Sequence, residues 1–161
     1  MSFSKKSFLA AVLAAAVVFV AAAAADHGDR GHGRTVLRQG LVGSILTDPP
    51  IHGVARGGLP WVGTGQARLQ RNGRFEARIR GLVIPSLGTP GPVTTITISL
   101  YCAPESSSAV FTTQPVALSS AGNARVRQHV TLPSRCLAPV LLVHPNGGAA
   151  AYIAATGFAT S

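Results

Sequence analysis

Apolar and polar residues alternate in short runs along the chain from Thr35 onwards. In the run VRQHVTL, residues 126–132, every second residue is apolar except Gln128. A period of two predicts a β-strand with one buried and one exposed face, because successive side chains point to opposite sides of a sheet. Gly, Pro, Asn and Ser separate the runs, and none of them has the period of a helix. The pattern therefore predicts an all-β domain.

The segment GQARLQRNGRFEARIRGLVIP, residues 65–85, predicts a hairpin around Asn72-Gly73. A two-residue turn there would pair Leu69 with Glu76 and put one of them on the wrong face. A type I turn that ends in a left-handed Gly73 gives a three-residue loop and pairs Leu69 with Phe75. We predict this longer loop because it aligns the apolar residues of both strands. The inward positions are then Phe75, Ala77, Ile79 and Val83.

Other runs predict the remaining strands. Residues 93–102 place Ile96, Ile98, Leu100 and Cys102 on one face. Residues 110–119 predict a strand interrupted near Pro115, and the apolar run at 138–143 predicts a strand covered on both faces. A first strand pair or a broken strand is expected at 35–46, a last strand at 151–158, and a long loop at 47–61 whose Trp61 plugs one end of the fold. Seven or eight short strands predict an antiparallel β-sandwich, with a β-barrel as the alternative.

The first segment has the features of a secretory signal peptide. Lys5 and Lys6 precede an apolar run that ends with small residues at Ala23 and Ala25. A basic start, an apolar centre and a small-x-small cleavage site are typical of such signals. The run is also long enough for an uncleaved membrane anchor, which is the alternative. We predict a signal peptide over 1–25, a flexible lead-in over 26–34 and a single domain over 35–161.

The two cysteines, Cys102 and Cys136, predict one structural disulfide. Disulfides persist in the oxidising compartments to which a signal peptide leads. An even count without CxxC spacing is not typical of a zinc site or of a redox pair. Cys102 also falls on the inward face of its strand.

The net positive charge of the chain is concentrated in part on the predicted exposed faces of the strands. Removal of residues 1–25 takes away both lysines and leaves 12 arginines against five acidic residues, a net charge of +7 with neutral histidine. A polar outer face needs no further explanation, because arginine stems cover apolar surface. The pleat nevertheless directs five of the arginines outward from the strands within 65–85 and 124–132, namely Arg68, Arg78, Arg80, Arg125 and Arg127.

These five arginines form a candidate anion-binding face if their strands share a sheet. Only Glu76 interrupts them, and we expect it to form an ion pair with Arg68 across the hairpin. Arginine presents paired donors that match phosphate and carboxylate groups. The expected partner is therefore an anionic cell-wall polymer or polysaccharide. No nucleic-acid motif is present, and basic charge alone is a weak signal for such binding.

Acidic residues are too sparse to predict an enzyme. A serine hydrolase needs a base and an orienting acid, and no GxSxG motif occurs. Asp26 and Asp29 fall in the lead-in, and Glu76 already has an expected partner. A glycosidase would need Asp48 and Glu105 to meet across the fold, whereas their surroundings predict two loop residues. We predict no catalytic residue.

The histidines are scattered, and we predict no metal and no cofactor. A copper site of the polysaccharide-oxidising kind needs histidine as the first mature residue, whereas the predicted cleavage leaves Asp26 first and His27 second. His129 lies among outward arginines, so it is expected on the surface. His144 precedes Pro145 at an expected turn, which predicts a loop residue.

Residues 35–158 resemble a group of small secreted proteins of high-GC bacteria that have no assigned activity. The resembling segments are GGLPW, NGRFEARIRGLVIP, ITISLYC, LPSRCLAPVLLVHPNG and YIAATGF, and both cysteines lie within them. The resemblance implies one disulfide-bonded secreted domain and supplies no catalytic residues. We expect a secreted or cell-surface, non-enzymatic protein. The alternatives are a small secreted hydrolase or metal-dependent enzyme with an unidentified site, and an antimicrobial protein that acts on anionic envelopes.

Overall fold

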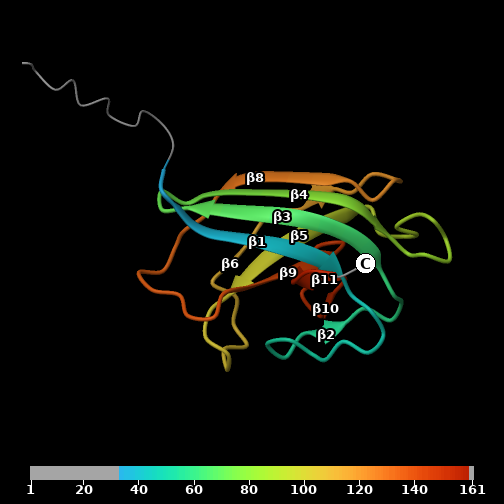
Figure 1. The fold of residues 1–161 in the computed structure, drawn as a ribbon, viewed down its shortest axis with the longest axis horizontal. Helices are drawn as coiled ribbons and strands as arrows, with labels where there is room; N and C mark the ends of the chain where they lie inside the picture. The colour runs from blue at the N-terminus through green and yellow to red at the C-terminus, as the bar shows by residue number, and fades with distance from the viewer. Residues whose placement is uncertain (1–32, 160–161) are drawn as a thin grey trace, which may run out of the picture. The chain divides into compact units, whose positions relative to one another are not determined.

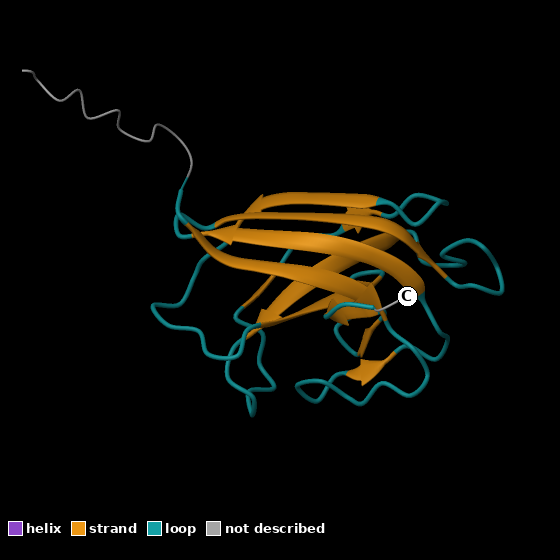
Figure 2. Ribbon diagram, viewed as in Figure 1, coloured by secondary structure: helices purple, strands orange, loops and turns teal. Residues whose placement is uncertain are grey.

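The computed structural model describes residues 33–159, and all its regular elements are β-strands (Figures 1 and 2). The all-β prediction is therefore confirmed. Within the described residues, no helix is long and apolar enough to cross a membrane. The predicted signal peptide and nearly all of the predicted lead-in lie outside the described residues. The strands are β1 (Thr35–Gly43), β2 (Ala55–Arg56), β3 (Val62–Gln70), β4 (Arg74–Val83), β5 (Thr95–Tyr101), β6 (Phe111–Thr112), β7 (Val116–Ala117), β8 (Ala124–His129), β9 (Val140–Pro145), β10 (Ala151–Tyr152) and β11 (Ala154–Thr156).

One curled antiparallel sheet forms most of the fold, in the order β6-β5-β9-β11-β1-β3-β4-β8, with β7 also paired to β5. Figure 1 shows β1, β3, β4 and β8 as one half and β5, β6, β9 and β11 as the other. The main core lies between the halves and includes Phe75, whose ring meets that of Phe111 edge-on at 5.3 Å. Trp61 is buried in the same core, as predicted. This curled sheet is a half-barrel, consistent with the predicted β-sandwich or barrel-like all-β fold.

The two ends of the sheet are joined by side-chain rather than backbone hydrogen bonds. β7 lies beside β8. The side-chain Oε1 of Gln128 on β8 accepts from the backbone N–H of Gln114 at 2.8 Å, and its Nε2 donates to the Gln114 carbonyl at 3.1 Å. Gln114 lies at the break between β6 and β7, next to Pro115, where the sequence predicts an interrupted strand. The polar residue in an otherwise apolar row therefore links the edges of the sheet.

The predicted hairpin register is confirmed. Leu69 lies opposite Phe75 and Ala67 opposite Ala77, and Gly73 has a φ of 86° after a turn closed by its N–H to the Gln70 carbonyl. The predicted inward direction of Val83 is wrong, since Val83 is half-buried and its neighbour Leu82 is fully buried instead. Gly81, with a φ of 60°, inserts one extra residue into β4 opposite Val62–Thr64. Such a bulge reverses the alternation beyond it.

The second half of the sheet is buried on both faces. β9 is covered as predicted, and Thr97 and Ser99 of β5 are also buried. Tyr101, Leu142 and Tyr152 form a second small core on this side, together with Val54 from the long loop. This loop contains β2, which pairs with β10 in a parallel two-stranded sheet. The long Pro/Gly-rich segment is therefore a cover for the outer face of β5 and β9.

Cys102 and Cys136 form the predicted disulfide, with a Cα–Cα distance of 5.0 Å. The bond joins the end of β5 to the segment that enters β9. Closing a loop with a sequence separation of 34 residues stabilises the fold by roughly 3–4 kcal/mol in the chain-entropy model.

Candidate anion-binding face

Besides Arg74, which binds Glu76, six exposed arginines lie on the outer side of β1, β3, β4 and β8. Alternation along each strand directs the small and apolar residues into the core, so the charged residues between them point outward. The five predicted arginines are all on this side, and Arg38 of β1 joins them. We call this surface the arginine face and define it by Arg38, Arg68, Arg78, Arg80, Arg125 and Arg127.

The strand register places these arginines in rows across the sheet. In one row Arg38 lies opposite Arg68, Arg68 opposite Glu76, and Glu76 opposite Arg127. In the next row Arg78 lies directly opposite Arg125. Directly opposed residues on one face have Cβ atoms about 4.5–5.5 Å apart, and like charges in this position are destabilising. The face therefore holds positive charges close together, in an arrangement that opposes folding stability.

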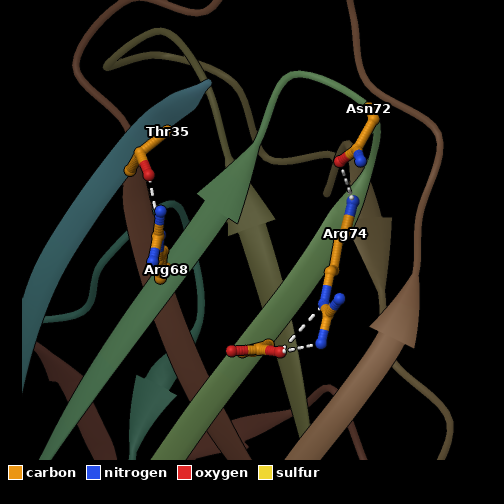
Figure 3. A network of polar contacts seen from close by, with 5 residues as sticks. Thr35, Arg68, Asn72 and Arg74 are labelled. Carbon is orange, nitrogen blue, oxygen red and sulfur yellow. Dashed lines mark hydrogen bonds and ion pairs between the residues drawn. The ribbon is translucent and has the colours of Figure 1, made fainter. Parts of the chain in front are cut away.

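Glu76 does not neutralise the face in the way the sequence predicts. Arg68 is opposite Glu76 as expected, but the ion pair is formed by Arg74, two residues away on the same strand. Arg74 Nη2 lies 2.7 Å and Nε 2.9 Å from Glu76 Oε1. Arg68 instead donates from Nε to Thr35 Oγ1 at 2.7 Å (Figure 3). The predicted Arg68–Glu76 pair is wrong because a nearer guanidinium on the same strand occupies the carboxylate.

The side chains surround a shallow hollow of about 400 Å³ on the outer side of the sheet. Five members of the arginine face line it, and Glu76 is the only acidic residue in its lining. Arg74 binds only Oε1 of Glu76, so this single carboxylate is shared between Arg74 and the five arginines of the lining, and the hollow keeps an excess of positive charge. The arrangement can accept several phosphate or carboxylate groups at once, since each guanidinium offers paired donors.

Arg38 was missing from the sequence prediction, although a signal for it exists. Leu37 and Leu41 have the spacing of an inward row, which directs Arg38 to the opposite face. The local pattern does not show that β1 pairs with β3, or that their register places Arg38 opposite Arg68. That pairing is a long-range contact and depends on the whole sheet.

The histidines occupy three different environments. His129 is exposed on β8, as predicted. His144 is not a loop residue, and this prediction is wrong: it lies within β9 and is fully buried. Its Nδ1–H donates to the Ala151 carbonyl at 2.8 Å, while Nε2 has no hydrogen-bond partner within residues 33–159. Burial lowers the pKa of the His144 imidazole below its usual value, and the bond to Ala151 opposes this only in part.

His52 helps to fasten two loops. Its ring stacks on Tyr101 with centroids 4.9 Å apart, and its Nδ1–H donates to the Ser106 carbonyl at 2.7 Å.

Asp48 and Glu105 lie outside the strands, and Asp48 accepts a hydrogen bond from the N–H of Ile45. Within residues 33–159 no group of three or more His, Cys, Asp or Glu side chains is arranged to hold a metal ion.

No protein-family model, curated protein or solved structure matches the chain. The resemblance to small secreted proteins of high-GC bacteria therefore stays a prediction. The features of the described residues that bear on function are the arginine face and the disulfide.

Proposed function

We propose that this protein is a secreted or cell-surface, non-enzymatic binding domain whose arginine face holds an anionic polymer of the cell envelope. The observation that carries the proposal is the pair of rows on the sheet, in which Arg38 lies directly opposite Arg68 and Arg78 directly opposite Arg125, with Glu76 as the only acidic residue in the hollow that these arginines line. Each pair of like charges directly opposite one another destabilises the sheet. A bound polyanion would remove this cost and gain charge-assisted hydrogen bonds.

The spacing of the arginines suits a chain that carries many charges rather than a single small anion. Neighbouring strands are about 4.8 Å apart, and outward residues two apart along a strand, such as Arg78 and Arg80, are about 7 Å apart. Several negative groups along one polymer can therefore be met at the same time. Teichoic acids, which carry phosphodiesters, and acidic polysaccharides, which carry carboxylates, share this chemistry.

The disulfide supports the proposed location. A bond between Cys102 and Cys136 suits an oxidising compartment, and envelope polymers are found on the outer side of the membrane. The predicted signal peptide points to the same place. The sparse acidic residues favour binding over catalysis.

Retention on immobilised polymers tests the proposal. The wild-type domain is compared with Arg78→Ala/Arg125→Ala and with the control Arg34→Ala/Arg56→Ala, which loses the same charge at residues that line neither this hollow nor the other hollow described below. We expect wild type and control to be retained in about 0.1 M salt and released in about 1 M salt, where the Debye length falls to about 3 Å. The test variant should lose retention at least tenfold.

Separate columns of a glycerol-phosphate teichoic acid and of a polyuronate distinguish the two polymer chemistries. Equal losses in both double variants would show that only net charge matters and would overturn the proposal. Retention of wild type that does not change with salt would overturn it as well.

A further inference from the structure

A second hollow lies at one end of the curled sheet, next to the disulfide, and has a volume of about 540 Å³. We call it the leucine pocket because Leu37 of β1, Leu69 of β3, Leu100 of β5 and Leu132 line it together with residues 133–136 and Pro139. Figure 1 shows the segment between β8 and β9 passing the end where β1 begins and β3 finishes. Leu69 and Leu100 belong to the main core and are only 3% and 1% exposed, so they form the floor of the pocket, while the half-buried Leu37 and Leu132 form its accessible apolar wall.

We propose that the leucine pocket binds a single-chain amphiphile with an anionic head group, of the fatty-acid class. This site is independent of the arginine face, since the two hollows have no lining residue in common. Ligand sites in proteins are typically hollows of about 300–1,000 Å³, and the mouths of β-barrels are among their usual places. Leucines from three strands and one loop form an apolar floor and wall that suit an alkyl chain.

Charge at the rim selects the head group. Arg71 and Arg135 also line the pocket and are exposed, and no acidic residue lines it. Within the described residues, neither arginine takes part in an ion pair. Arginine forks match carboxylate and phosphate groups in a bidentate manner. An anionic head would therefore sit at the rim while its tail displaces water from the leucines.

The segment that forms the outer wall of the pocket makes few hydrogen bonds to the rest of the fold. Residues 131–135 take part in no backbone–backbone hydrogen bond within residues 33–159. The wall is fixed beyond them by the disulfide at Cys136, by the Ala103 N–H to Leu137 carbonyl bond at 2.7 Å and by Gln39 Nε2, which donates to the Pro139 carbonyl. Leu132 and Arg135 therefore lie on a wall that can adjust to a chain without breaking a strand ladder.

Titration with saturated fatty acids, in competition with a fluorescent fatty acid, tests the proposal. We expect one saturable site, with affinity that rises by up to about fourfold per added methylene until the pocket is filled. The acid should bind at least tenfold more tightly than the alcohol of equal length, and an alkyl phosphate should bind like the acid. An alkyl trimethylammonium ion should bind more weakly than either.

Two variants separate the tail site from the head site. Leu132→Trp fills the hollow from a half-buried loop position and should abolish binding at unchanged melting temperature. Arg71→Ala/Arg135→Ala should keep the dependence on chain length but lose the preference for acid over alcohol. Arg78→Ala/Arg125→Ala should bind the acids like wild type, so failure of the polymer proposal and failure of this one are distinguishable.

Affinity that does not depend on chain length would overturn the proposal, as would equal binding of the acid and the trimethylammonium ion. Unchanged binding in both the Leu132 and the Arg71/Arg135 variants would place the ligand elsewhere and would overturn it too.

Discussion

Arg78 on β4 lies directly opposite Arg125 on β8, and both side chains are exposed. In the neighbouring row of the same sheet, Glu76 lies between Arg68 and Arg127, whereas the direct neighbours of Arg78 are Gln66 and Arg125. An acidic residue in place of Arg125 would be more favourable for stability, because opposite charges across strands are stabilising. The arrangement therefore predicts a measurable conflict between stability and binding.

Replacement of Arg125 by glutamate exposes this conflict. In Arg125→Glu the new carboxylate faces Arg78, so the free energy of unfolding should rise by roughly 0.2–1 kcal/mol in low salt. The gain should shrink in 1 M salt, and retention on the anionic polymer should be lost. Urea unfolding at both salt concentrations measures the effect, with Arg135→Glu as a loop control that is expected to stay within about 0.5 kcal/mol of wild type. A less stable Arg125→Glu protein would contradict the repulsion inferred here.

Gln128 should hold the two edges of the sheet together. Gln128→Ala removes both hydrogen bonds to the Gln114 backbone, and each typical bond contributes about 0.5–1.5 kcal/mol net. We expect a loss of about 1–3 kcal/mol in the free energy of unfolding and faster hydrogen exchange at the Gln114 amide. Gln66→Ala is the matched control, because the Gln66 side chain makes no hydrogen bond within the described residues. Unchanged exchange at Gln114 would show that closure does not depend on this side chain.

His144 should make the protein less stable in mild acid. Burial lowers the pKa of its imidazole in the folded state, so the unfolded chain binds a proton at higher pH than the folded one does. The stability is thus complete above the ordinary pKa of 6.5 and declines as the pH falls below it towards the folded-state pKa, by at most about 1.4 kcal/mol per pH unit. Urea unfolding between about pH 7.5 and pH 5 measures the slope.

The variants His144→Leu and His129→Ala locate the source of that slope. His144→Leu should remove most of the pH dependence, whereas His129→Ala, at an exposed position, should retain it. An NMR titration that finds an unshifted His144 imidazole would refute the explanation.

Local patterns were sufficient for much of the fold. The alternation of residues 126–132, the bulged turn at Gly73 and the double-sided burial of β9 depend on side-chain size and turn conformation over a few residues. These properties act at short range, so they can be recognised along the chain. The inward phase of Cys102 is a local property of this kind, whereas its pairing with Cys136 was predicted also from the even cysteine count and the predicted signal peptide; the structure confirms that pair.

Other features depend on which strands become neighbours. His144 has the sequence context of a turn, yet β9 continues through it because β5 supplies a partner as far as Pro145. Glu76 was expected to pair with Arg68, yet Arg74 occupies it, because competition between guanidinium groups depends on side-chain directions.

The sequence by itself determined that Arg68, Arg78, Arg80, Arg125 and Arg127 point outward, since the pleat has a period of two. Only the tertiary structure decided that they form one surface, that Arg38 joins them and that residues 132–139 enclose the leucine pocket. Strand order, register and the path of a loop arise from contacts between residues far apart in the chain. No local pattern of residues contains that information.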